Sequence, residues 1–255
     1  MTRTALITGA AGGIGRAVAT RFAADGHQVA GVDLADPELP GVRYQRADVT
    51  DEQQVRAAVR ATTEEFGGLD ILVACAGVTR GAPLHETTAE QWDAVLIANL
   101  TSVFLCVRAA LPALMARGGS VVAIGSVLHQ TAAPGLPAYA AAKGAIAALF
   151  RQLAVDYGRY GITFVTVSPG WIRTPATESR LTHDTDLDRL RESTPLRTLG
   201  TPEEIAAAVA YAAAPDAALL TGSELVLDGG ASITSPASLL RDGHRERLGL
   251  PPLTP

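Results

Sequence analysis

Short, continuous apolar runs alternate along this chain with longer segments that have the periodicity of a helix. The runs are Thr4–Thr8, Gln28–Asp33, Ile71–Ala74, Ser120–Ile124, Ile162–Val167 and Glu224–Leu227. The helical segments are Ile14–Ala24, Glu52–Phe66, Ala89–Ala116, Ala138–Tyr157 and one that begins at Pro202 after Thr201 as its N-cap. Strands that are apolar on both faces are typical of a parallel sheet covered by helices. The alternation therefore predicts an α/β fold with a doubly wound parallel sheet and helices on both faces.

The domain organisation follows from the same rhythm, because no repeat or linker interrupts it within the 255 residues. We expect a single domain over residues 1–235. Within it, residues 175–199 are polar, lack a strand pattern and are predicted to form a lid. Residues 236–255 form a tail containing Pro, Arg and Leu, predicted either to pack over a neighbouring subunit near its lid or to be a frayed terminus.

Charge and cysteine content exclude several classes of protein. The chain has 21 basic and 26 acidic residues and no basic cluster, so a nucleic-acid partner is not expected. Two cysteines, Cys75 and Cys106, are too few for a disulfide framework or a zinc site and fit a reducing compartment. No uninterrupted apolar run reaches the roughly 18 residues of a membrane span. We therefore expect a cytoplasmic protein without a membrane partner or a bound metal.

A glycine-rich turn, residues 8–15, follows the first predicted strand directly and leads into a predicted helix. Glycines at Gly9, Gly13 and Gly15 permit a tight turn and let the backbone approach a pyrophosphate at the N-terminus of that helix. Placed between a strand and a helix, the turn predicts a dinucleotide site in a Rossmann-type fold.

The end of the second predicted strand indicates which dinucleotide binds. Asp33 lies there, 18 residues after Gly15. A carboxylate at this place accepts hydrogen bonds from the 2′-hydroxyl of a ribose and repels a 2′-phosphate. Gly12, rather than a basic residue, precedes Gly13, although Arg16 lies nearby. NAD is therefore the expected cofactor, and NADP is disfavoured.

Two residue types that occur once each mark candidate catalytic positions. Lys143 is the only lysine among the 21 basic residues, and Asn99 is the only asparagine. Lys143 shares one face of a predicted helix with Tyr139, four residues earlier. Hydride transfer from an alcohol needs a base for the hydroxyl proton, and a phenol serves at neutral pH only when nearby cations favour the phenolate. Ser126 follows the preceding predicted strand and is expected to hydrogen-bond the substrate oxygen.

These motifs together resemble the short-chain dehydrogenase/reductase family, classical type. The resemblance covers residues 3 to about 231. It comprises the glycine-rich turn, Asp48-Val49, Asn99, Ser126, Tyr139-x-x-x-Lys143, Pro169-Gly170 with Thr174, and the closing Asp228-Gly229-Gly230. It implies an NAD-dependent oxidoreductase that interconverts a secondary alcohol and a ketone.

The resemblance also implies roles for individual residues. Tyr139 would be the general acid/base, and Ser126 would polarise the substrate oxygen. Lys143 would bind the nicotinamide ribose, and Asn99 would maintain a proton relay through water. The residues implied to bind the cofactor are Gly9, Gly13, Ile14, Gly15, Asp33, Asp48, Val49, Ala76, Gly77, Tyr139, Lys143, Pro169, Ile172 and Thr174. His129 and Trp171 join Ser126 and Tyr139 as candidate substrate contacts.

One segment departs from the pattern of the family. The family has Asn-Asn-Ala-Gly after the fourth strand, whereas residues 74–77 read Ala-Cys-Ala-Gly. The missing amides normally brace that loop, so their loss is expected to affect its stability. No base lies next to Cys75 in the sequence, which favours a buried thiol over a nucleophile.

Three alternative functions remain open. The short interval 33–48 leaves no room for a full helix between the second and third strands, as in the dihydrodiol dehydrogenases of the family. An NADPH-linked ketoreductase is disfavoured by Asp33, and a non-catalytic dinucleotide sensor is disfavoured by the complete catalytic set. The apolar helices Ala89–Ala116 and Ala138–Tyr157 further predict a homotetramer, because the family commonly assembles through these helices.

Overall fold

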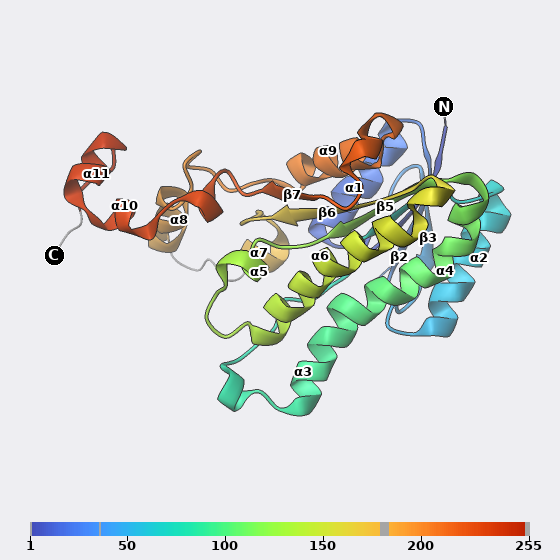
Figure 1. Cartoon of the computed structure of the whole chain (residues 1–255), viewed down its shortest axis with the longest axis horizontal. Coiled ribbons are helices and arrows are strands. Elements are labelled where there is room, and N and C mark those ends of the chain that lie inside the picture. Colours follow the sequence, from blue (N-terminus) through green and yellow to red (C-terminus); the bar gives the residue numbers. More distant parts are fainter. Residues whose placement is uncertain (1, 36, 179–183, 253–255) are drawn as a thin grey trace.

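A seven-stranded parallel sheet forms the centre of the computed structural model, which describes residues 2–35, 37–178 and 184–252. The strands are β1 (Thr4–Thr8), β2 (Gln28–Asp33), β3 (Val42–Arg46), β4 (Ile71–Ala74), β5 (Gly119–Ile124), β6 (Ile162–Pro169) and β7 (Glu224–Leu227). Their order is β3-β2-β1-β4-β5-β6-β7, and every neighbouring pair is parallel. Helices lie on both faces of the sheet (Figure 1), so the predicted doubly wound α/β fold is confirmed.

The two faces of the sheet carry separate cores. On one face, α1 (Gly13–Ala24) and α9 (Pro202–Ala213) pack together, and their buried residues include Phe22 and Val209. On the other face lie α2 (Glu52–Phe66), α4 (Ser102–Arg117) and α6 (Pro137–Tyr157). There Phe150 of α6 meets Phe164 of β6 edge to face, with ring centroids 5.7 Å apart. Burial on both faces explains why the five central strands, β2, β1, β4, β5 and β6, are continuous apolar runs.

Local signals set the helix boundaries. At α9, Thr201 is the N-cap and Pro202 is the first helical residue, as predicted, and Glu204 completes a capping box with Thr201. The side chain of Asp51 caps α2, which ends at Gly67 with a left-handed φ of 76°. Short 3₁₀ helices occur at Leu84–Glu86, Gly158–Tyr160, Pro215–Leu220 and Ala231–Ile233.

Strand β3 lies at the edge of the sheet and was absent from the apolar runs. It pairs only with β2, and its sequence Val-Arg-Tyr-Gln-Arg alternates instead of being continuously apolar. An edge strand has one neighbour and is partly exposed, so a continuous apolar run is not required there. No helix occurs among the described residues between β2 and β3, which agrees with the short interval 33–48.

The predicted helix Ala89–Ala116 is interrupted by a turn with wider pitch. It consists of α3 (Ala89–Leu96), a π-helical segment η2 (Ile97–Thr101) and α4. By length and composition, the stretch Ala89–Arg117 is apolar enough to cross a membrane, and half of its most apolar window is buried in the fold. The stretch is not an uninterrupted apolar run, because Asn99, Ser102 and Arg108 interrupt it, and it meets this criterion by its mean hydropathy. The contacts of α4 with α2, β4 and β5 explain this apolarity by its position in the core.

The polar segment 175–199, which is predicted to form a lid, contains two short helices among its described residues. These are α7 (Pro175–Glu178) and α8 (Asp184–Glu192). The tail forms two further short helices, α10 (Pro236–Leu240) and α11 (Asp242–Arg247), which extend from the body beside α8 in Figure 1.

A buried arginine holds the tail to this segment of the same chain. Arg245 is 3% exposed and donates hydrogen bonds to the backbone oxygens of Leu239 and Pro251 and to the carboxylate of Glu192, at 3.0 Å. The described part of the tail is therefore folded and not frayed, and it contacts its own α8. Packing over a neighbouring subunit stays a prediction.

Candidate active site

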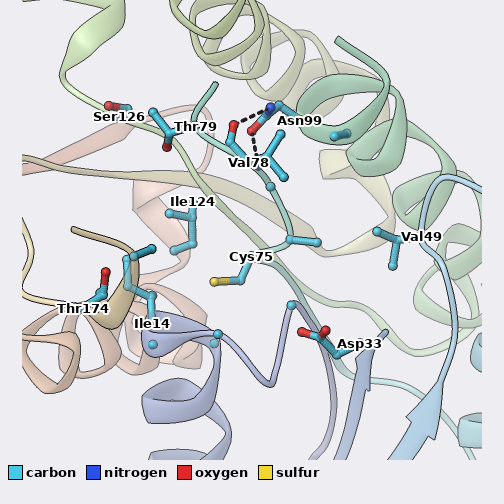
Figure 2. Close-up of a pocket in the computed structure, with 18 of the residues that line it drawn as sticks. Ile14, Asp33, Val49, Cys75, Val78, Thr79, Asn99, Ile124, Ser126 and Thr174 are labelled. Atoms are coloured by element: carbon cyan, nitrogen blue, oxygen red, sulfur yellow. Dashed lines mark hydrogen bonds between the residues drawn. The ribbon is translucent and has the colours of Figure 1, made fainter. Parts of the chain in front are cut away.

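A cavity of about 510 Å³ opens at the carboxyl ends of the strands. The chain runs from β1 to β2 and β3 on one side and then returns to place β4 on the other side of β1. Ligands of doubly wound sheets bind where the strand order reverses in this way. The predicted cofactor and catalytic residues that line this cavity are Gly9, Gly13, Ile14, Gly15, Asp33, Asp48, Val49, Ala76, Gly77, Asn99, Ser126, Tyr139, Lys143, Pro169, Ile172 and Thr174. Residues far apart in sequence are thus brought into one site (Figure 2).

Two positions of the glycine-rich turn, Gly9 and Gly15, pack too closely against their surroundings to carry a side chain. A Cβ atom on Gly9, which has φ of 67°, would lie 2.7 Å from the backbone nitrogen of Ala76. A Cβ atom on Gly15 would lie 2.1 Å from the backbone oxygen of Gly9. The turn therefore lies directly against the loop that follows β4, residues 75–78, called the β4 loop below. It presents the N-terminus of α1 to the cavity, where backbone N–H groups favour an anion.

The end of the cavity beside β2 is acidic. Asp33 accepts a hydrogen bond from the backbone N–H of Ala11 at 3.0 Å, which ties it to the glycine-rich turn. Asp48 accepts hydrogen bonds from the N–H and the hydroxyl of Thr50, at 2.8 and 2.7 Å. A carboxylate can accept several hydrogen bonds, so Asp33 keeps capacity for a diol.

The β4 loop, which lacks the two amides of the family, is held by other residues. The hydroxyl of Thr8 accepts hydrogen bonds from the backbone N–H groups of Cys75 and Ala76, at 3.2 and 3.3 Å. The Asn99 amide donates to the oxygen of Val78 at 2.9 Å and accepts from its N–H at 3.2 Å (Figure 2). Two side chains from other elements therefore anchor this loop at both ends.

The thiol of Cys75 points into the cavity (Figure 2). Burial raises its pKa to about 12, and the positive charge of Lys143 offsets only part of that rise. Because the thiolate is the reactive form of cysteine, this residue lacks the activation that a nucleophile needs. Its effect at this site is on the shape and polarity of the cavity wall.

The π-helical segment η2 places Asn99 at the site. Asn99 is fully buried, and its amide also donates to the backbone oxygen of Val95, one turn earlier in the helix, at 2.9 Å. The wider turn leaves this oxygen available to a side chain, and such turns occur often at functional sites. A Cβ atom on Gly77 would lie 2.6 Å from Asn99 Oδ1 and 3.7 Å from Lys143 Nζ. Asn99, Gly77 and Lys143 thus converge.

Lys143 and Tyr139 project from successive turns at the start of α6. Lys143 is 5% exposed, and its ammonium donates to the backbone oxygen of Ile124 at 2.7 Å. The same Nζ lies 5.6 Å from the centroid of the Tyr139 ring. An ammonium has three donors, and the contact with Ile124 uses one of them. The arrangement places a positive charge beside the phenol within the cavity.

Ser126 lies between β5 and α5 (Leu128–Thr131). Its side-chain oxygen accepts a hydrogen bond from the N–H of Leu128 at 3.2 Å, so the hydroxyl proton remains for another acceptor. The N–H of Val127 donates to the oxygen of Pro169 at 3.1 Å. This bond joins the loop that carries Ser126, residues 125–127 and called the serine loop below, to Pro169 at the end of β6, where the next loop begins.

The loop after β6 forms the remaining wall of the cavity. Ile172 is buried, and its backbone is bridged to Gly200. The hydroxyl of Thr177 donates to the backbone oxygen of Ile172 at 2.6 Å. Its oxygen lies 3.1 Å from the hydroxyl oxygen of Thr174. Sequence reasoning missed Thr177, because no short motif connects it with the cavity.

Two of the candidate substrate contacts are not brought into the cavity. The lining contains neither His129 nor Trp171 among the described residues. The ring of His129 instead lies 2.6 Å from the carboxylate of Glu224, and Trp171 is 42% exposed. Sequence reasoning placed His129 near the substrate from its distance to Ser126 and did not detect Glu224, 95 residues away.

The match to known families covers most of the chain. The family description that matches is enoyl-(acyl carrier protein) reductase, over residues 9–232. The protein belongs to the short-chain dehydrogenase/reductase family. Members of this family use nicotinamide dinucleotide cofactors.

Individual relatives align over nearly their full length. The chain is 41% identical to a 2-(R)-hydroxypropyl-CoM dehydrogenase of Xanthobacter autotrophicus, over 90% of this chain and 98% of that protein. It is 36% identical to a D-threitol dehydrogenase of Mycolicibacterium smegmatis, over 91% and 93% of the two chains. The ligand-free aldohexose dehydrogenase of Thermoplasma acidophilum superposes with a TM-score of 0.89, at 28% identity, over 92% and 96%.

Proposed function

We propose that the protein is an NAD-dependent dehydrogenase that interconverts a secondary alcohol and a ketone. The observation that carries the proposal is the convergence of Asn99, Ser126, Tyr139 and Lys143 in one cavity with the glycine-rich turn of β1 and α1. Relatives named as hydroxypropyl-CoM and threitol dehydrogenases support the same reaction class.

The cavity fits a nicotinamide dinucleotide. The bare backbone at Gly9 and Gly15 leaves room for a pyrophosphate at the N-terminus of α1, and Asp33 supplies an acceptor for a ribose diol. Lys143 supplies donors at the other end. When bound, the nicotinamide supplies the acceptor or donor of the hydride.

The side chains divide the proton chemistry among them. Ser126 donates its hydroxyl to the substrate oxygen, which orients that oxygen toward Tyr139. The phenolate of Tyr139 removes the hydroxyl proton during oxidation, and the phenol returns it during reduction. The ammonium of Lys143, 5.6 Å from the ring centroid of Tyr139, would attract the negative charge that forms on the phenol oxygen during the transfer. Asn99 fixes the β4 loop and the π-helical turn behind Lys143, where a water would continue the proton relay.

The lining of the cavity supports NAD as the preferred cofactor. Asp33 and Asp48 lie at the end next to β2, and Lys143 is the sole cation among the described lining residues. A 2′-phosphate placed beside Asp33 would face a carboxylate, and no arginine is among the described residues that line the cavity. This arrangement disfavours the NADPH-linked ketoreductase, although a relative at 35% identity is the 3-oxoacyl-[acyl-carrier-protein] reductase of Vibrio cholerae.

Initial rates with NAD and NADP over a panel of secondary alcohols, vicinal diols and dihydrodiols test this proposal. We expect turnover of secondary alcohols with a higher kcat/KM for NAD. The Tyr139→Phe variant is expected to lose a factor of about 10²–10⁴ in kcat and to bind NADH within a few-fold of wild type. Wild-type turnover by this variant would refute the role of the phenol, and a dinucleotide complex without any turnover would favour a sensor.

The assembly and location of the protein are separate proposals. We infer a homotetramer, which the exposed apolar side chains of Phe104 and Met115 on α4 and Val155 on α6 support. Light scattering of the purified protein tests it, and a monomeric mass would refute it. We also infer a cytoplasmic location, in accord with two cysteines that form no disulfide. Cell fractionation with an antibody tests the location.

A further inference from the structure

A largely buried carboxylate outside the cavity connects three elements. Glu224, at the start of β7, has a side chain that is 15% exposed. Its Oε1 accepts a hydrogen bond from the hydroxyl of Ser168 at 2.5 Å and lies 2.6 Å from Nε2 of His129. Its Oε2 accepts a hydrogen bond from the side-chain amide of Gln130 at 3.2 Å. Three donors from β6 and α5 thus converge on one residue of β7.

The ionised state of Glu224 fixes the direction of these hydrogen bonds. Burial by itself would raise the pKa of this carboxyl, but the hydrogen bonds from Ser168 and His129, with the charge on His129, lower it overall. A carboxylate only accepts, so Nε2 of His129 must carry the proton in this contact. Hydrogen bonds to a charged group are stronger than neutral ones. The cluster is therefore a strong connection between the strands and α5.

Two of the partners of Glu224, His129 and Ser168, belong to elements that connect directly with residues of the proposed active site. His129 lies on α5, whose first residue, Leu128, donates its N–H to the side-chain oxygen of Ser126. Ser168 precedes Pro169, the last residue of β6. The loop that begins there lines the cavity through Ile172 and Thr174, at the end where the nicotinamide is proposed to bind. One carboxylate therefore holds both the loop that carries the serine and the loop opposite it.

The residue before Ser126 packs tightly against one member of this cluster. A Cβ atom on Gly125, directly before Ser126, would lie 2.3 Å from the hydroxyl oxygen of Ser168. Glu224 pairs in register with Thr166, so both side chains lie on the same face of the sheet. Ser168 lies on that face as well, because side chains two residues apart on a strand point to the same side. The carboxylate thus reaches Ser168 directly under the serine loop.

We propose that Glu224 is a positioning residue of this enzyme, which acts through His129 and Ser168 to fix the hydroxyl of Ser126 against the nicotinamide side of the cavity. The proposal rests on the function proposed above, in which Ser126 orients the substrate oxygen. Displacement of a catalytic group by about 1 Å can cost a factor of about 10² in rate. A side chain that sets this position therefore affects kcat without touching substrate or cofactor.

A double-mutant cycle with Ser126 separates positioning from general stabilisation. We expect Glu224→Ala to lower kcat about 10–100-fold while the Kd for NADH changes less than about twofold. In a Ser126→Ala background, the same substitution should lower kcat less than about twofold, because the hydroxyl that it positions is absent. Glu224→Gln keeps one acceptor oxygen and should retain a higher kcat than Glu224→Ala. Equal losses in both backgrounds would overturn the proposal.

Amide hydrogen exchange tests the connection without relying on turnover. In the cofactor-free protein, Glu224→Ala should accelerate exchange in the segment 126–131, which carries Ser126 and α5. The matched control is Glu64→Ala, since Glu64 is a 71% exposed glutamate of α2 whose nearest cation is 3.9 Å away. Unchanged exchange in Glu224→Ala would overturn the proposal. Faster exchange in an enzyme without alcohol dehydrogenase activity would support the connection and refute only the proposed function.

Discussion

The hydroxyl of Thr8 is the contact whose removal gives the clearest measure of how this chain compensates for its altered β4 loop. Thr8 is 3% exposed and accepts two hydrogen bonds, from the N–H groups of Cys75 and Ala76. Replacing it with Val keeps the branched shape and removes only the acceptor. The perturbation therefore isolates the hydrogen bonds from packing.

The expected cost follows from the geometry. A buried N–H left without a partner costs about 1–3 kcal/mol. Because the two bonds of Thr8 share one oxygen and are long, we expect a combined loss near 2 kcal/mol in the free energy of unfolding. For a chain of this size that corresponds to a decrease in Tm of about 4–8 °C. A looser loop at Ala76, which lines the cavity, should also raise the Kd for NADH by up to about tenfold.

Denaturant unfolding and fluorescence titration with NADH measure both effects. The control is Thr8→Ser, which keeps the hydroxyl and loses one methyl group, so it should lower stability by about 0.8 kcal/mol and leave the Kd for NADH unchanged. If Thr8→Val unfolds and binds NADH like the wild type, the hydroxyl does not brace the loop and the reasoning is refuted.

Four further substitutions test other contacts. Lys143→Arg should be nearly inactive in alcohol oxidation assays despite its retained charge, because a guanidinium cannot reproduce the compact buried contact with Ile124; near wild-type kcat would contradict this. Asp33→Ala should reduce the preference for NAD over NADP, measured as a ratio of kcat/KM values, by about 1–3 kcal/mol; an unchanged ratio would exclude Asp33 as its source. Arg245→Met should make the tail susceptible to limited proteolysis at a rate about tenfold higher or more, since it removes a buried ion pair with Glu192; an equally resistant tail would show that the pair is dispensable. Glu224 has a lowered pKa in the folded state, so its contribution to stability is present above the ordinary glutamate pKa of 4.5 and is lost as the pH falls; Glu224→Gln should therefore flatten the loss of unfolding free energy in acid, and an identical acid profile would contradict the lowered pKa.

Local sequence determined most of the fold. Apolar runs predicted six of the seven strands; in the five central strands, burial on both faces leaves the same local signature, and β7, at the other edge, has the apolar run Leu225–Leu227 although it is only partly buried. Edge strand β3 lacks that signature, since its exposure follows from its place in the sheet. The capping box of α9 was predictable because it involves only residues 201–204.

The candidate site was predictable where it depends on short motifs. The glycine-rich turn and the pair Tyr139 and Lys143 are contiguous or nearly so, and the geometry of a turn or a helix fixes their relation. Their roles in catalysis stay predictions until the variants above are measured.

Tertiary structure alone decided which distant side chains meet. Thr8 braces a loop 67 residues later, and Glu224 receives a hydrogen bond from His129, which precedes it by 95 residues. Arg245 reaches Glu192 across 53 residues. Such contacts depend on strand order, register and the path of loops, which no local pattern specifies. For this reason the sequence placed His129 beside the substrate, whereas the folded chain turns it toward a carboxylate of β7 beneath the serine loop.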